Sequence, residues 1–508
     1  MNGGTVDVLV IGAGFGGSLA SMLVQRIGLR AALIDRATHP RFALGESSTP
    51  LADLILAELA QRYELPRLAP LTKYGPWQQA YPEIPCGLKR GFSYFQHRPG
   101  DAFQPDRSHE NELLVAASFD DARGDTHWYR PTFDAFICQE AQAAGIPFHD
   151  ATAIEAIEPR GDGWAVSARR DGQALRFNAR FLVDASGEGG VLARSFGLKQ
   201  QPECLRTRSR AIFGHFTGVR PWQEWLAAHG GQTEDHPFPC DDAALHHIFE
   251  DGWMWVLRFN NGITSAGLVL DLDRHPLPAD LSPQQEWEAV IARYPAVAWQ
   301  FAEAQLVAPQ GGLRRTGRVQ RCAEQFTGPN WAMLPTTAGI VDALHSSGNA
   351  HTLCGIARLV EMLQRHWSQP SLAVAMQRYE QNLRQELSLI DQIVHGCFAA
   401  FGRFDLLATF AMTYFAAASV SEQRRRGGLA ADDAFLQAHD REFRHMVDQL
   451  HTRVLALASL PEAYPGADKS FILEAAQALA PYNIAGLCNS ARQNMYLHSE
   501  GEPHARGS

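Results

Sequence analysis

Gly12-Ala13-Gly14-Phe15-Gly16-Gly17 is the stretch that decides the fold of this 508-residue chain. An apolar run at residues 6–11 precedes it and predicts a buried strand, and the residues after it are apolar at helical spacing. A second apolar run at residues 31–34 follows and closes in Asp35. This strand, turn, helix and strand form the unit in which a glycine-rich turn binds a dinucleotide.

Each of three glycines in the turn has a separate physical task. Gly12 permits the tight turn, Gly14 lets a pyrophosphate approach the backbone, and Gly17 allows the helix and strand to pack closely. Asp35 lies about 20 residues further on, where a carboxylate accepts hydrogen bonds from ribose hydroxyls. The sequence therefore predicts a nucleotide-binding α/β domain.

Two further segments favour FAD over NAD. Residues 181–187, Phe-Leu-Val-Asp-Ala-Ser-Gly, form another apolar strand that runs into a turn of small residues. Flavoproteins of the hydroxylase superfamily have a similar turn near the dinucleotide, which marks Asp184 and Gly187. Residues 128–134, Trp-Tyr-Arg-Pro-Thr-Phe-Asp, resemble the Arg-x-x-x-Asp element of that superfamily and mark Arg130.

A pair of tryptophans indicates what is done with the cofactor. Residues 252–259 read Gly-Trp-Met-Trp-Val-Leu-Arg-Phe. On a strand, Trp253 and Trp255 point to the same face and can form an aromatic wall beside a bound ring system. Core packing is the alternative interpretation, because buried strands favour aromatic residues.

Composition excludes several classes of protein. A formal net charge of -10 without long basic runs argues against nucleic acid or membrane as the main partner. The N-terminus has no signal-peptide pattern, so we expect a cytoplasmic protein. Eight scattered cysteines without a C-x-x-C pair indicate reduced thiols and no metal site. The longest uncharged run, residues 406–421, is shorter than the roughly 20 residues that span a bilayer, and predicts a buried helix.

The chain divides into two predicted regions. Residues 1–360 form an FAD-binding core, in which residues from about 205 to 305 supply a β-sheet on the substrate side. Residues 361–508 form a helical region, where an apolar stripe recurs at intervals of three and four. The polar stretch at residues 99–125 has little periodicity and predicts a surface insertion or lid.

Four segments together resemble the flavin-dependent halogenases. They are residues 12–17, residues 40–50 (Pro-Arg-Phe-Ala-Leu-Gly-Glu-Ser-Ser-Thr-Pro), residues 86–92 (Cys-Gly-Leu-Lys-Arg-Gly-Phe) and residues 252–259. The resemblance covers about the first 360 residues and is greatest to members that act on free phenols. It implies a Rossmann-like FAD-binding α/β fold of the hydroxylase and halogenase type, with an interleaved substrate-side sheet and a helical C-terminal region.

The resemblance also implies a reaction and its residues. Reduced FAD, O2 and chloride or bromide give hypohalous acid, which passes along a tunnel to Lys89; a separate NAD(P)H-dependent reductase supplies the reduced flavin. The tunnel wall is Trp253 and Trp255. The residues implied around FAD are Gly12, Gly14, Gly17, Asp35, Arg36, Glu46, Arg130, Asp184, Gly187 and Asp342. The halide would be held by backbone N–H groups at Ser347, Gly348 and Asn349.

His345 stands where tryptophan-type enzymes have a glutamate, and this points to a phenol, which needs only deprotonation to become nucleophilic. A histidine of near-neutral pKa suits that task, and His246 and His247 are further candidates. Two alternatives remain open. One is an aromatic hydroxylase that inserts oxygen and binds NAD(P)H itself. The other is a halogenase-fold flavoprotein without halogenating activity. It rests on His345 and on Arg258, which replaces the proline that ends the Trp-x-Trp segment in the family.

Overall fold

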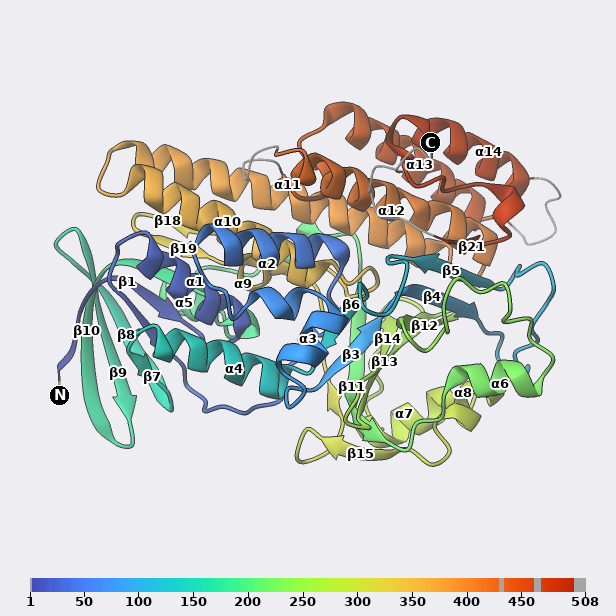
Figure 1. Ribbon diagram of the computed structural model, residues 1–508, viewed down its shortest axis with the longest axis horizontal. Coiled ribbons are helices and arrows are strands. Elements are labelled where there is room, and N and C mark those ends of the chain that lie inside the picture. The colour runs from blue at the N-terminus through green and yellow to red at the C-terminus, as the bar shows by residue number, and fades with distance from the viewer. Residues whose placement is uncertain (1, 429–433, 461–466, 498–508) are drawn as a thin grey trace.

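Two β-sheets joined by a helical layer make up the chain in a computed structural model, which describes residues 2–428, 434–460 and 467–497 (Figure 1). The first sheet has the order β18-β19-β10-β1-β2-β7, and β9 and β8 extend it from β10. Its strands are β1 (Asn2–Ile11), β2 (Ala31–Ile34), β7 (Phe148–His149), β8 (Thr152–Arg160), β9 (Gly163–Arg170), β10 (Gln173–Asp184), β18 (Thr327–Gly328) and β19 (Trp331–Met333).

The centre of this sheet is parallel and buried. β1 pairs in parallel with β2 on one side and with β10 on the other. Val8, Leu9 and Val10 are fully buried, as expected for a strand covered on both faces. Helix α1 (Phe15–Arg26) packs against β1 and β2, so the strands and helix predicted around the glycine turn are confirmed.

The second sheet has the order β15-β11-β14-β13-β12-β4-β5-β21, with β16 beside β11. Its strands are β4 (Gly91–Gln96), β5 (Glu112–Ala116), β11 (Ser209–Thr217), β12 (Ala244–Phe249), β13 (Gly252–Arg258), β14 (Thr264–Asp271), β15 (Gln305–Ala308), β16 (Arg314–Arg315) and β21 (Met495–Tyr496). Two short ladders stand apart: β3 (Cys86–Lys89) with β6 (Asp125–Trp128), and β17 (Arg321–Cys322) with β20 (Gly339–Ile340). The interleaved sheet is therefore present, and it also takes strands from residues 91–116.

The expectation of a lid over residues 99–125 is wrong for its middle part. Residues Glu112–Ala116 form β5, which lies between β4 and β21 and is buried along its whole length. Five residues rich in Leu, Val and Ala are too short a run to show a period, so the polar flanks hid this strand.

Helices cover the first sheet and fill the C-terminal third. The long ones are α10 (Ser347–His366), α11 (Ser371–Ala399), α12 (Phe404–Arg426), α13 (Arg441–Ala458) and α14 (Ala467–Leu479), drawn in orange and red in Figure 1. The others are α2 (Pro50–Arg62), α3 (Tyr74–Ala80), α4 (Arg130–Ala143), α5 (Val191–Ser195), α6 (Trp222–Ala228), α7 (Pro283–Ile291), α8 (Pro295–Gln300) and α9 (Pro335–Ala338). The apolar stripe predicted on α11 is buried, from Met376 to Val394.

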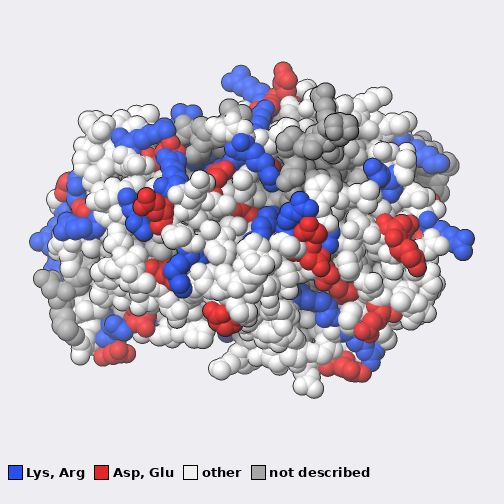
Figure 2. Space-filling view, in the orientation of Figure 1, with Lys and Arg blue, Asp and Glu red and all other residues white. Residues whose placement is uncertain are grey.

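Helix α12 carries the uncharged run that the sequence predicted to be buried. By length and composition it is a helix that could cross a membrane, yet 83% of its most apolar window is buried inside the protein. One hydrophobic core joins the first sheet to α10, α11 and α12, and a second core lies between the other face of the second sheet and α6, α7 and α8. On the visible face of the molecule, basic and acidic side chains are mixed rather than gathered by sign (Figure 2).

Candidate active site

The glycine turn lies where β1 ends and α1 begins. Gly12 has a φ of +105°, and a Cβ atom there would lie 2.5 Å from the carbonyl oxygen of Ala185. A Cβ atom at Gly17 would lie 1.8 Å from the carbonyl oxygen of Gly12, so only glycine fits either position. Gly14 precedes α1 and offers no side-chain cap to the first-turn N–H groups. Free N–H groups and the helix dipole at such a position favour an anionic group such as a phosphate.

Asp35 braces this turn. Its carboxylate accepts hydrogen bonds from the backbone N–H of Ala13 at 2.6 Å and of Ala37 at 2.8 Å. Arg41 pairs with the same carboxylate at 2.6 Å. Because a carboxylate has about four acceptor positions, Asp35 can hold the turn and still accept from a ribose.

A second wall comes from the loop after β2, held by Arg130 at the start of α4. The guanidinium binds Asp134 in a bidentate ion pair of 2.7 and 2.8 Å. It also donates to the carbonyl oxygens of Leu44 and Gly45, at 2.5 and 3.0 Å. The side chain of Glu46 contacts His215 Nε2 on β11 at 2.7 Å. The loop is therefore anchored to α4 and to the second sheet.

Asp184 shapes the turn after β10 and does not line the cleft. Its carboxylate accepts from the backbone N–H and the hydroxyl of Ser186 and from the N–H of Leu192, at 3.0, 2.6 and 2.7 Å. Burial raises the pKa of this carboxyl. Gly187, which the turn presents, does line the cleft.

The start of α10 forms a further wall. Ser346, just before the helix, has a φ of +52° and makes no side-chain cap. Gly348 and Asn349 line the cleft, whereas Ser347 does not. Asp342 lies upstream and accepts from the Ser209 hydroxyl at 3.0 Å, and burial raises its pKa to about 7. The uncapped helix start favours an anion, and the halide site expected at Ser347, Gly348 and Asn349 stays a prediction.

These walls enclose a cleft of about 1490 Å³ between the two sheets. The predicted residues that line it are Gly12, Gly14, Asp35, Arg36, Glu46, Arg130, Gly187, Trp253, Trp255, Asp342, Gly348 and Asn349. The cleft exceeds the usual size of a small-ligand site. Its volume, the glycine cradle and the uncapped start of α1 fit an FAD molecule.

The two tryptophans stand on β13 as expected. Both line the cleft, and their ring centroids are 6.0 Å apart. Trp253 is fully buried, and Trp255 donates from Nε1 to the Ser265 hydroxyl at 3.1 Å. Beside them, His246 on β12 also lines the cleft, with its ring centroid 5.2 Å from that of Trp253. An aromatic wall therefore separates the cleft from the interior of the second sheet.

Lys89, at the end of β3, is fully buried behind this wall. Its Nζ donates to the carbonyl oxygen of Ser48 at 2.5 Å and lies 3.9 Å from the ring centroid of Phe92. Phe92 stacks on His246 at 6.1 Å, which links Lys89 to the cleft through aromatic contacts. Burial lowers the pKa of the Lys89 amine from 10.5 to about 8.

Two curated enzymes match most of this chain. It is 31% identical over 415 residues to the monodechloroaminopyrrolnitrin halogenase PrnC of Pseudomonas fluorescens, which covers 80% of this chain and 70% of PrnC. It is 31% identical over 448 residues to the tetracycline 7-halogenase of Kitasatospora aureofaciens, covering 85% and 78% of the two chains. The chain belongs to the flavin-dependent halogenases.

Other comparisons agree on the fold of this halogenase. The solved structure of halogenase PltM in complex with phloroglucinol and FAD superposes with a TM-score of 0.83 at 24% identity, over 96% of this chain and 99% of PltM. No family model matches the chain. The cofactors are those of the family, FAD, halide and O2.

Sequence reasoning missed a group of charges around Lys89 in the halogenase. Asp125 on β6 lies opposite Lys89 in the β3–β6 ladder, and Asp53 on α2 lies near both. Lys73 pairs with Asp125 at 2.9 Å and with Asp53 at 3.5 Å. The Ser48 hydroxyl donates to Asp53 at 2.6 Å. Burial and the charge of Asp125 raise the pKa of Asp53. These residues come from four separate segments of the chain, so no local sequence pattern could predict that their charges meet.

The near-neutral pKa expected for a histidine base is wrong for the three candidates in this halogenase. Burial lowers the pKa of His345 and His246 to about 3 and that of His247 to about 4. His345 stacks on Tyr414 with ring centroids 4.5 Å apart, and does not line the cleft. A neutral imidazole so hard to protonate is a poor proton acceptor.

Arg258, which replaces the usual proline, does not line the cleft. Its Nε contacts Asp241 at 3.1 Å and its Nη2 donates to the carbonyl oxygen of Val219 at 2.8 Å. Its own backbone lies against Gly87, where a Cβ atom would be 1.9 Å from the Arg258 carbonyl oxygen. In this halogenase the end of β13 therefore supports the strand that carries Lys89.

Proposed function

We propose that this halogenase makes hypohalous acid from chloride or bromide and transfers the halogen through Lys89 to a small electron-rich phenol. O2, activated by the bound reduced FAD, would supply the oxidising equivalents for this chemistry. The observation that carries the proposal is Lys89 itself, a buried amine with a pKa near 8 behind an aromatic wall.

We assign the FAD to the cleft. The start of α1 would hold the pyrophosphate between Gly12, Gly14 and Gly17, and Asp35 and Arg36 would face the ribose. The wall opposite would comprise Glu46, Arg130, Gly187 and Asp342, with Asp184 acting through the turn. The N–H groups of Ser347, Gly348 and Asn349 would hold the halide. This assignment is supported by the way these segments meet around a single cleft.

Lys89 transfers the halogen in two steps. Its free amine attacks hypohalous acid, which forms a nitrogen–halogen bond and releases water. The aromatic ring then takes the halogen and loses a proton, and the amine is restored. The first step needs an unprotonated amine, and burial makes one available near neutral pH.

The surroundings of Lys89 favour a polar aromatic ring as substrate. Phe92, Tyr94, His246, His345, Tyr414 and Phe415 form an aromatic cluster in mutual ring contact. Within the described chain, Tyr94 Oη and His345 Nδ1 are buried without a hydrogen-bond partner. A phenol bound here would stack on the rings and bond one of these atoms through its hydroxyl. His345 would then orient the substrate as a hydrogen-bonding group, and PltM, of the same fold, has been solved with phloroglucinol.

We further propose a two-component enzyme of the cytoplasm. The chain has one glycine-rich dinucleotide fingerprint, at residues 12–17, and that one serves FAD. Reduced flavin would then come from a separate NAD(P)H-dependent reductase. Nucleic acid has no place in this proposal, because the protein has a formal net charge of -10 and no long basic run.

A single assay tests the proposal. Purified protein is incubated with a flavin reductase, NADH, FAD, halide and a panel of phenols, with free tryptophan as the comparison substrate, and products are read by mass spectrometry. A halogen isotope doublet on a phenol, with little reaction of tryptophan, is expected. An oxygenated product would instead support an aromatic hydroxylase, and flavin turnover without halide-dependent product would support a non-halogenating flavoprotein.

A further inference from the structure

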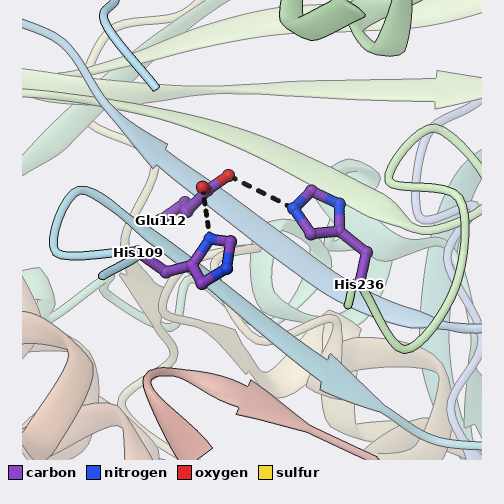
Figure 3. A group of neighbouring side chains, drawn as sticks. All are labelled: His109, Glu112 and His236. Carbon is purple, nitrogen blue, oxygen red and sulfur yellow. Dashed lines mark hydrogen bonds and ion pairs between the residues drawn. The ribbon is translucent and has the colours of Figure 1, made fainter. Parts of the chain in front are cut away.

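A cluster of two histidines and a glutamate lies outside the cleft, at the start of β5 in the second sheet. His109 precedes β5, Glu112 is the first residue of β5, and His236 lies in the loop between α6 and β12. Figure 3 shows the Glu112 carboxylate between the two imidazole rings. The sequence offered no signal for it, because His236 is far along the chain from the other two.

The donor atoms of this cluster converge. One oxygen of Glu112 is 2.6 Å from His109 Nδ1, and the other is 3.6 Å from His236 Nε2. One ligand atom from each residue lies within 4.8 Å of the other two. Ligand atoms around a tetrahedral zinc ion are about 3.3 Å apart, given bonds of about 2.0–2.1 Å. Small side-chain shifts would therefore close these three groups on one ion.

Two of the ligand atoms are buried and make no hydrogen bond among the described residues. Glu112 Oε2 and His236 Nε2 have no hydrogen bond, and their separation of 3.6 Å is too long for one. The side chains of Glu112 and His236 are only 2% and 3% exposed. Leaving such polar atoms unsatisfied costs on the order of 1–3 kcal/mol each, and a bound cation would satisfy both.

The surroundings supply the second contact that metal-binding histidines usually have. Asp235 lies 2.9 Å from His109 Nε2, the ring nitrogen that faces away from Glu112. A carboxylate on the far nitrogen fixes the ring and its tautomer. Nδ1, which now contacts Glu112, would then be the nitrogen that binds the ion. The cluster therefore has mixed ligands, because two imidazole rings face one carboxylate.

We propose that His109, Glu112 and His236 bind one zinc ion. Two imidazoles and a carboxylate are ligands that zinc prefers, and hard cations such as Mg²⁺ and Ca²⁺ favour all-oxygen sites. The ion would tie the loop before β12 to the start of β5.

That loop also supports the strand turn beside Lys89. A few residues after His236, the carbonyl oxygen of Asp242 accepts from the backbone N–H of Arg90 at 2.6 Å. The next carbonyl, of Ala243, contacts His127 Nε2 at 3.0 Å. Zinc is therefore a structural clamp in this proposal, and its effect should appear in the stability of the folded protein.

The test uses the full-length protein freed of metal by chelator and titrated with ZnCl2 alone. The exposed thiol of Cys204 is first removed by Cys204→Ser in every protein, because it could bind zinc by itself. Bound zinc is measured by isothermal titration calorimetry and by elemental analysis, and thermal unfolding is followed with and without zinc. The variants are His236→Ala and Glu112→Gln, and the control is His445→Ala, an exposed histidine on α13.

One zinc per chain, with a higher melting temperature in its presence, is expected for the parent and the control. His236→Ala and Glu112→Gln should each weaken zinc binding at least tenfold and abolish the thermal shift. If Glu112→Gln does not fold, His236→Ala alone decides. Zinc binding that is absent from the parent, or unchanged in His236→Ala, would overturn the proposal.

Discussion

The pKa of the Lys89 amine predicts how halogenation depends on pH. With a pKa of about 8, about half of the amine is free at pH 8, about one tenth at pH 7 and about one hundredth at pH 6. With the ordinary pKa of 10.5, only about one part in 3,000 would be free at pH 7. Burial therefore raises the supply of reactive amine by about 300-fold at neutral pH.

The assay is the ratio of halogenated product to O2 consumed, measured from pH 6 to pH 9 with one phenol. Dividing by the O2 consumed corrects for changes in the rate of flavin oxidation. The ratio then reports the fraction of hypohalous acid that Lys89 captures. Where capture is inefficient, the ratio should rise up to about tenfold per pH unit and level off above about pH 8.

Neighbouring charges should move this profile in opposite directions. Asp125 raises the pKa of Lys89, so Asp125→Asn should shift the rise to lower pH. Lys73 lowers it, so Lys73→Gln should shift the rise to higher pH. A charge several ångströms away in the protein is worth about one to two pKa units. A ratio that is flat with pH, or that falls as pH rises through 8, would refute the free-amine mechanism.

Three further outcomes follow from the same geometry. Lys89→Ala should reduce halogenation at least 100-fold while O2 consumption continues, and Lys89→Arg should also fail because a guanidinium stays protonated; halogenation by the alanine variant at the parental rate would contradict the assignment. Gly17→Ala should lose FAD binding and destabilise the fold by on the order of 1–3 kcal/mol, measured by flavin absorbance and thermal unfolding, because its Cβ would overlap the Gly12 carbonyl. NADPH alone should not reduce the bound flavin rapidly in a stopped-flow experiment, and rapid reduction would argue for a single-component enzyme.

Local patterns were sufficient for the parts of the protein that depend on neighbours in sequence. The glycine turn follows from steric limits within a few residues, and Gly12 and Gly17 have no room for a side chain. The stripe on α11 follows from the helical period and is buried. The two tryptophans of β13 share a face because side chains alternate along a strand. Each of these features was predicted from the sequence and is present in the fold.

Long-range packing decided what the sequence could not show. β5 is buried because β4 and β21 pair with it from distant parts of the chain, and its own five residues carry no period. The low pKa of His345 arises from burial under α12, and its sequence neighbours do not reveal this. Asp125 reaches Lys89 only through the β3–β6 pairing.

The chemistry of the site therefore rests on both levels. The sequence, through its resemblance to the halogenases, predicted which residues bind a flavin and which lysine carries a halogen. Only the tertiary structure decided that Lys89 is buried among two carboxylates and a second lysine, and that His236 meets Glu112. The physical reason is that a pKa and a ligand set depend on desolvation and on charges brought together through space, and these are properties of the packed fold.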